Sequence, residues 1–347
     1  MKKWKSVLKR IILVTFVFLI LITALVLCIE IKRIPKPWAL NEEFHLQNSS
    51  LGRYYIDFSE RKYLRGAIHL DKDGVPLCEG YYHPVYISQY ALGAFDYYLN
   101  TGNKEAKKAF LTCAAWLRDN LAKRNGFFYW EYTFEIECPG GLYKNPWFSA
   151  MAQGEGVSVL LRAFCETRQQ EYLSAAQRAI EPIFHDLSEG GISVVKQDDY
   201  IFPQEYPTSP VSDILNGAIF AYIGVYEYYR VTEELRVKQF CDKIIKTFLS
   251  VIDEYDIGYW SLYSRWPKKS LASPHYNSLH IAQLRALYLI TGKEKFLEYS
   301  RKFESHQSNW TNRARYVFLT HWRQIKEFRL KDIRKIPAFT KKILFED

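Results

Sequence analysis

Tyr97-Tyr98-Leu99-Asn100-Thr101-Gly102 ends one helical pattern, and a second helical pattern begins within a few residues of it. Three later stretches have the same form and also turn at a threonine: Phe164–Thr167, Tyr228–Thr232 and Tyr288–Gly292. The four threonines are 66, 65 and 59 residues apart, a spacing that indicates an internal repeat. We predict a helical hairpin at each turn, with glycine as the helix stop and threonine as the N-cap of the following helix.

The pattern after each turn is that of an amphipathic helix, because apolar residues recur at three- and four-residue spacing. Two examples are Ala109, Cys113, Trp116 and Leu117, and Val237, Phe240, Ile244 and Phe248. A second break occurs in phase with the first, at glycines 65 and 67 residues apart: Gly126, Gly191 and Gly258. The repeating unit is therefore helix, short turn, helix, long loop.

Units of this kind bury their apolar faces against one another, so the sequence predicts a mainly α fold, an α/α toroid of repeated helical hairpins. The long loops, residues 125–147, 190–210 and 258–277, should gather at one end of the ring. Function is often carried on loops that a rigid scaffold holds, so we expect the site at that end. Residues 37–80 lack helical periodicity and predict a short extended segment with a small β element.

Composition and charge exclude several classes of protein. The chain has 347 residues, of which 48% are apolar and 16% aromatic, so it is not disordered, and its rings suit a rigid core or sugar-stacking surfaces. The net charge of +9 belongs to the ends, since residues 1–36 carry +7, residues 313–347 carry +6 and the middle carries −4. A nucleic-acid partner is therefore not expected. We expect the toroid domain over residues 81–312 and a basic extension after it.

The amino terminus predicts a membrane anchor. Five basic residues precede an uncharged apolar run, residues 11–29, which as a helix would measure roughly 28 Å, enough to cross a bilayer. No small-residue cleavage site follows it, which favours an uncleaved anchor over a signal peptide. The excess of basic residues before the run places the amino terminus in the cytoplasm and the remaining domain outside.

The six cysteines do not predict a metal site, because they show no C-x-x-C pair and no zinc-ligand spacing. Cys113, Cys165 and Cys241 fall in helical patterns and are expected to act as small buried apolar residues. Cys78 and Cys138 fall in loop-like sequence, where pairing outside the cell is open.

The second long loop holds a carboxylate and a phenol next to prolines. It contains Glu205 and Tyr206, followed by Pro207 and Pro210, and leads to Asn216. Prolines hold a loop in extended geometry, which would present Glu205 and Tyr206 rigidly to a ligand. An ordinary rigid turn has the same sequence.

In the third long loop, alternation places four residues on one face: Tyr259, Ser261, Tyr263 and Arg265. Phenols and a guanidinium there could bind a carboxylated sugar, with a bidentate contact from Arg265. A half-buried hairpin has the same pattern. Tyr276 stands just outside the next helix start, and His280 stands in its first turn, where the helix dipole disfavours a protonated imidazole; a lone histidine is more often structural.

Residues 143–155, which contain Pro146-Trp147-Phe148-Ser149-Ala150-Met151-Ala152-Gln153-Gly154, resemble the P-x-[YF]-S-A-M-A-Q-G signature of the D-glucuronyl C5-epimerase family. These enzymes convert glucuronate into iduronate within heparan-type chains. Further blocks are similar to the family in the same order: Gly80–Pro84 with Gln89-Tyr90, Glu205–Pro210 with Leu215–Gly217, Tyr255-Asp256 with Gly258 and Tyr263, and Tyr276 with His280 and Gln283-Leu284. The resemblance covers about residues 75–305.

The resemblance implies a toroid and a mechanism in which a base removes the C5 proton of a uronate and an acid returns a proton to the opposite face. It implies that the reaction needs no nicotinamide and no metal cofactor. It also implies a glucuronate-containing polysaccharide as partner and a homodimer. By position, Glu205 and Tyr276 would be the acid/base pair, with Tyr206 and Tyr263 lining the reacting centre. The residues implied to bind substrate are Tyr81, Tyr82, Gln89, Trp147, Gln153, Asn216, Arg265 and His280. The family arginine stands one residue after position 265, and His83 stands where the family usually has tyrosine.

Three alternatives to an epimerase remain open at this point. A polysaccharide lyase begins with the same C5 proton abstraction but then expels the C4 oxygen. A glycan-binding protein would keep the aromatic cleft without the chemistry. A glycoside hydrolase would need two suitably separated carboxylates, and the loop acids that could supply them are Glu131, Glu135, Glu137, Asp198, Asp199 and Glu205.

Overall fold

The structure, a computed structural model, describes residues 15, 17, 18, 25, 28–32, 35, 38–45, 51–65, 68–196 and 199–335. The chain forms two compact units, Pro37–Glu304 and a smaller one made of Met1–Lys36 with Ser305–Asp347. The smaller unit includes α10 (Trp310–Lys335). Among the described residues no helix is both long and apolar enough to span a bilayer. Most of the predicted anchor, residues 11–29, lies outside the described residues, and so does Asp198.

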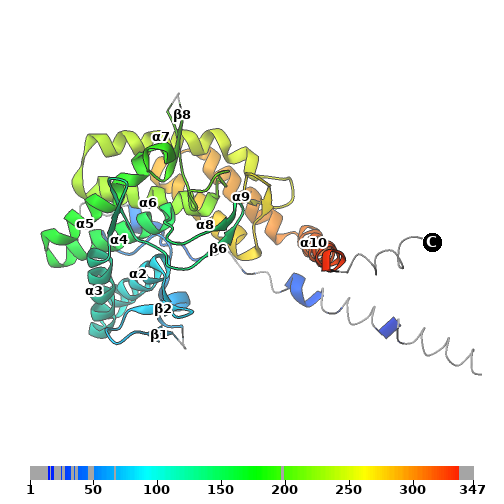
Figure 1. Cartoon of the computed structure of the whole chain (residues 1–347), viewed down its shortest axis with the longest axis horizontal. Helices are drawn as coiled ribbons and strands as arrows, with labels where there is room; N and C mark the ends of the chain where they lie inside the picture. Colours follow the sequence, from blue (N-terminus) through cyan, green and yellow to red (C-terminus); the bar gives the residue numbers. More distant parts are fainter. Residues whose placement is uncertain are drawn as a thin grey trace, which may run out of the picture. The chain divides into compact units, whose positions relative to one another are not determined.

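Four helical hairpins follow one another along the chain, as Figure 1 shows. They are α2 (Pro84–Thr101) with α3 (Lys104–Asp119), α4 (Ala150–Thr167) with α5 (Gln170–Ile180), α6 (Leu215–Thr232) with α7 (Leu235–Val251), and α8 (Pro274–Thr291) with α9 (Glu294–Ser308). The fold is therefore mainly α and built of helical hairpins, as predicted.

The first helix of each hairpin is the more buried one. In α4, every residue from Ala150 to Ala163 is buried, whereas α5 buries one face only. The helices α2, α4, α6 and α8 contact one another in chain order, so they form an inner row. The closest approach is between α4 and α6, where a Cβ on Gly224 would come within 2.4 Å of the Gly154 carbonyl oxygen.

The threonines at the short turns do not cap the second helix, so that part of the prediction is wrong. Each is the last residue of the first helix, and its hydroxyl donates to the carbonyl four residues earlier: Thr101, Thr167, Thr232 and Thr291. Each also accepts from the backbone N–H two residues later. The residue in between is left-handed, and Gly102 and Gly292 fill this position as predicted helix stops. Asn103 is the cap of α3.

The long loops form antiparallel hairpins just before the inner helices. These are β4 (Ala122–Arg124) with β5 (Phe127–Tyr129), β6 (Ile136–Cys138) with β7 (Gly141–Tyr143), β8 (Ser193–Lys196) with β9 (Tyr200–Pro203), and β10 (Leu262–Ser264) with β11 (Ser270–Leu271). A three-stranded sheet of β1 (His69–Leu70), β2 (Pro76–Cys78) and β3 (Tyr81–Tyr82) precedes α2. The hairpins therefore meet the amino-terminal ends of the inner helices.

The first part of the larger unit, residues 38–45 and 51–65, is called here the leading segment. It contains η1 (Glu42–His45) and a single-turn π-helix, η2 (Ser59–Tyr63). Its aromatic residues Tyr54, Tyr55 and Phe58 are fully buried in the main core. Three further short helices are η3 (Glu181–Phe184), η4 (Leu187–Glu189) and η5 (Ile252–Tyr255).

The cysteines occupy two kinds of position. Cys113 and Cys241 are buried, as the helical pattern predicts, whereas Cys165 is half-buried. Cys78 and Cys138 form no disulfide within the part of the chain that the structure describes. The Cys138 thiol instead donates to the Gly141 carbonyl oxygen at 3.1 Å.

Candidate active site

Glu205 is the centre of a buried polar cluster at the start of α6. It follows β9, and its side chain lies against Gly217, where an added Cβ would come within 2.3 Å of Glu205 Oε2. Glu205 Oε1 accepts a hydrogen bond from the Tyr263 hydroxyl at 3.2 Å, and Oε2 accepts one from Asn216 Nδ2 at 3.2 Å. Tyr206 supplies a third side-chain hydrogen bond. The glycine therefore leaves the space that this carboxyl occupies.

The environment of Glu205 changes its acidity. Burial raises its pKa from 4.5 to about 7, and the hydrogen bonds from Tyr263, Tyr206 and Asn216 limit the rise because they stabilise the carboxylate. A carboxyl with a pKa near neutrality exists in both protonation states at physiological pH. It can accept or donate a proton, which is what general acid–base catalysis requires.

Three tyrosines surround this carboxyl. The Tyr263 and Tyr276 rings lie 4.7 Å apart between centroids at 40°. Burial raises the pKa of Tyr276 to about 12, and it raises the pKa values of Tyr206 and Tyr263 well above 10. Each phenol therefore keeps its proton near pH 7, and Glu205 is hydrogen-bonded to Tyr263, whose ring packs beside that of Tyr276.

Arg265 lies next to the cluster but is engaged elsewhere. Its guanidinium forms ion pairs with Asp213 and Glu254, each at 2.7 Å, and donates to the Tyr200 hydroxyl at 2.9 Å. Asp213 in turn accepts from Gln204 Nε2 at 2.7 Å, one residue before Glu205. The arrangement holds the loop that carries Glu205 and leaves Arg265 paired with acids of the chain itself.

A family model described as "D-glucuronyl C5-epimerase C-terminus" matches residues 122–305, which hold the whole Glu205 cluster. The chain belongs to this epimerase C-terminal family.

Two curated relatives are similar over about half of this chain. The D-glucuronyl C5-epimerase of Caenorhabditis elegans is 30% identical over 206 residues, which are 54% of this chain and 32% of that protein. An uncharacterized protein of Methanocaldococcus jannaschii is 31% identical over 183 residues, 51% of this chain and 57% of that protein. The chain thus matches less than two thirds of the length of either relative.

Solved structures show only distant likeness. A D-mannose isomerase aligns with TM-score 0.48 and 10% identity, covering 72% of this chain and 66% of that one. An unsaturated glucuronyl hydrolase specific for heparin aligns with TM-score 0.46 and 13% identity, covering 65% and 62%.

Of the residues that the epimerase resemblance assigned to substrate, three serve buried contacts within the chain. Gln153 accepts from the Trp130 backbone N–H and donates to two backbone carbonyls. His280 is fully buried with Nδ1 3.0 Å from the Ser261 hydroxyl, and burial lowers its pKa to about 3, so its ring is neutral. Arg265 is the third. Their roles in binding substrate stay predictions, with a structural role visible for each.

An aromatic row leads from the surface to Glu205. Tyr81 is 48% exposed, and its ring lies 5.2 Å from that of Phe134, which lies 5.8 Å from Trp147. Trp147 stacks on Tyr132 and lies 5.6 Å from the Tyr206 ring. Tyr82 is not part of this row, since it stacks on Trp116 and donates to Asp71.

The sequence analysis missed two titratable residues that interact electrostatically with this region. Glu155 is fully buried, accepts from Gln89 Nε2 at 3.0 Å, and has a pKa raised well above 4.5 by burial. Its signal in the sequence is a lone acid within the apolar run of α4. Lys62 in η2 is close enough to Glu155 for each to shift the pKa of the other. No local pattern marks Lys62, because the fold brings η2 to this place.

Proposed function

We propose that this chain is a C5-epimerase of hexuronic acid residues in a polysaccharide, converting D-glucuronate to L-iduronate. The observation that carries the proposal is the cluster of Glu205, Tyr263 and Tyr276, in which a carboxyl of pKa about 7 is hydrogen-bonded to Tyr263 and the Tyr263 ring lies 4.7 Å from that of Tyr276, a phenol of pKa about 12. Membership of the epimerase family supports it. The aromatic row ending at Tyr206 suits the stacking of sugar rings.

In the proposed mechanism, Glu205 removes the proton from C5, so the C5–H bond breaks and the carboxylate becomes a carboxylic acid. Tyr276 then gives its hydroxyl proton to C5 from the opposite face. After the reaction Glu205 carries a proton and Tyr276 has lost one. Tyr263 restores them, because it accepts the proton of Glu205 while passing its own to Tyr276.

The test is proton NMR of the chain incubated with an unsulfated glucuronate-containing polysaccharide in deuterated water. We expect deuterium at C5 together with iduronate signals. Tyr276→Phe should lower the rate by about 100-fold or more, because the acid is removed while the ring remains. An unsaturated, ultraviolet-absorbing product would identify a lyase instead, and saturable binding without exchange would identify a glycan-binding protein.

We propose further that the hairpins close as an α/α toroid. Support comes from the inner row α2, α4, α6 and α8, and from the leading segment, which contacts α2 through η2 and α8 through η1. The homodimer implied by the family is a proposal that sedimentation of the purified chain would test.

We also propose that residues 11–29 anchor the chain with the catalytic unit outside the cytoplasm. The basic cluster before the apolar run supports this orientation. Protection of the larger unit from protease added on the outer side of the membrane would contradict the proposed location, and release of the chain by alkaline washing would contradict the anchor.

A further inference from the structure

Epimerisation at C5 creates a need for a cation that the Glu205 cluster does not fill. The substrate carboxylate is attached to C5, and it takes up negative charge when the proton leaves. Arg265 is already paired with Asp213 and Glu254. His83 is neutral near pH 7, since burial lowers its pKa to about 4. A different basic side chain must meet the carboxylate.

Lys62 is placed to be that side chain. It belongs to η2, and its ammonium lies 5.0 Å from the Tyr86 ring centroid in the first turn of α2. The preceding Arg61 lies 4.0 Å over the Trp38 ring, which in turn lies 5.0 Å from the ring of His275. His275 is the residue before Tyr276, so η2 lies beside the starts of both α2 and α8.

The ammonium of Lys62 is also available to bind a substrate carboxylate. Lys62 is half-buried, and among the described residues no acid lies within ion-pair distance of its ammonium. The acid that affects it is Glu155, which also interacts with Glu205. Burial lowers the pKa of the Lys62 ammonium, and the nearby Glu155 carboxyl opposes that shift.

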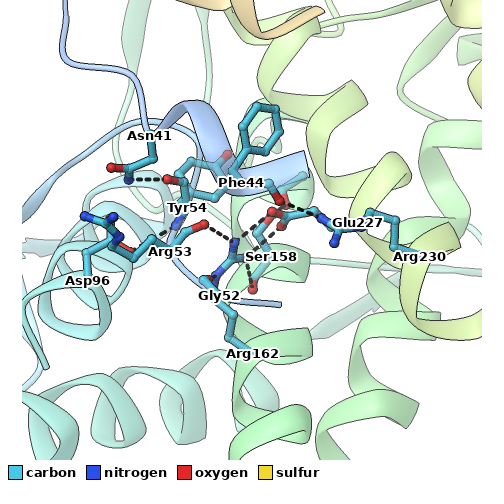
Figure 2. Close-up of polar contacts among 11 residues, drawn as sticks. Asn41, Phe44, Gly52, Arg53, Tyr54, Asp96, Ser158, Arg162, Glu227 and Arg230 are labelled. Atoms are coloured by element: carbon cyan, nitrogen blue, oxygen red, sulfur yellow. Dashed lines mark hydrogen bonds and ion pairs between the residues drawn. The ribbon is translucent and has the colours of Figure 1, made fainter. Parts of the chain in front are cut away.

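The leading segment that carries Lys62 is held firmly by three inner helices (Figure 2). Arg162 of α4 donates from Nε to the Gly52 carbonyl at 2.9 Å and forms a bidentate ion pair with Glu227 of α6 at 2.7 and 2.8 Å. Asp96 of α2 accepts from the Tyr54 backbone N–H at 3.0 Å.

Two more contacts extend this hold along the leading segment. Arg230 donates to the Phe44 carbonyl at 2.9 Å. Gly93 lets α2 approach Phe58, because an added Cβ would come within 2.6 Å of the Phe58 carbonyl oxygen. Fixed backbone directly before η2 positions a side chain better than a free loop would.

We propose that Lys62 binds the carboxylate of the uronate that enters the Glu205 site, and so selects carboxylated sugars. This inference rests on the proposed function. It names the residue that would recognise the acid group, and it assigns that task to the leading segment instead of to Arg265.

The test compares two polymers on the full chain in detergent: an unsulfated polysaccharide of glucuronate and N-acetylglucosamine, and the same polymer with its carboxyl groups reduced to alcohols. Wild type should bind the carboxylated polymer about tenfold to 100-fold more tightly, the contribution of a charge-assisted hydrogen bond. Lys62→Gln should bring the ratio of the two affinities close to one. Lys62→Arg, which keeps the charge, should retain most of the preference.

Lys72→Gln is the matched control, because Lys72 is an exposed lysine in the turn between β1 and β2, and it should leave the ratio unchanged. Lys62→Met keeps the apolar stem over Tyr86 and replaces the glutamine variant if that one fails to fold. A preserved ratio in either charge-removing variant, or no preference in wild type, would overturn the proposal. C5 exchange is measured separately, so a wild type that shows the preference without exchange would contradict the epimerase and not the role of Lys62.

Discussion

Glu205 and Glu227 are two buried glutamates associated with the same helix, and they have opposite surroundings. Glu227 forms a bidentate ion pair with Arg162, and both side chains are 1% exposed. Glu205 lies beside the start of α6, about 16 Å along the helix from Glu227, and its hydrogen-bond donors are the neutral groups of Tyr263, Tyr206 and Asn216. A charged partner makes a buried carboxylate structural, whereas neutral donors leave its proton free to move.

The two ends of the inner helices thus have separate tasks. The Glu227 end holds the leading segment in place through Arg162. The Glu205 end holds the polar groups suited to proton transfer. Removing a carboxyl from water costs free energy at both ends. The ion pair with Arg162 offsets that cost for Glu227, whereas for Glu205 the cost shows as a raised pKa.

The largest expected effect is on activity at the Glu205 end. Glu205→Gln removes the proton acceptor but keeps the shape of the side chain, so C5 deuterium incorporation should fall by about 100- to 10,000-fold. Initial rates followed by NMR would measure it, with the thermal unfolding midpoint as the control for folding. A variant that retains exchange within a factor of about three would contradict the role of Glu205 as base.

At the Glu227 end the largest effect should be on stability. Arg162→Met leaves Glu227 buried without its partner, and the free energy of unfolding should fall by about 3–5 kcal/mol. Chemical denaturation would measure the loss. Adding Glu227→Gln to the same chain should recover part of it, because the unpaired charge is then removed. A loss below about 1 kcal/mol would mean that the ion pair does not hold the core.

The pH dependence of stability should show the raised pKa of Glu205. The folded-state pKa of Glu205 is raised from 4.5 to about 7, so the folded state binds its proton more tightly than the unfolded state. Stability from this group is present below about pH 4.5 and is lost as the pH rises through about 7, by about 3 kcal/mol. Unfolding measured across this range in wild type and Glu205→Gln should show a steeper loss of stability in wild type. Equal slopes would contradict the raised pKa.

The smallest effect is expected at the short turns. Thr101→Ala removes one hydroxyl that donates to the Tyr97 carbonyl at 2.7 Å and accepts from the Asn103 N–H at 3.2 Å. The site is exposed, so unfolding should become easier by only about 0.5–1 kcal/mol, with C5 exchange unchanged. Denaturation of the variant gives the first value, and a marked loss of exchange would show that the turn end affects the site.

The sequence by itself determined the hairpins, because helical periodicity and turn residues are local signals. It also indicated Glu205, Tyr206, Tyr263 and Tyr276 through short family blocks, and the structure brings these four side chains together. Their catalytic roles stay predictions until the variants are measured.

Only the tertiary structure decided how the charges pair. Arg265 is 52 residues from Asp213, and Arg162 is 65 residues from Glu227. Sequence spacing does not reveal contacts at such separations, so Arg265 appeared free for a substrate, whereas Asp213 and Glu254 occupy it. The place of Lys62 has the same origin: the core buries the aromatic residues of the leading segment, and that burial carries η2 to the starts of α2 and α8.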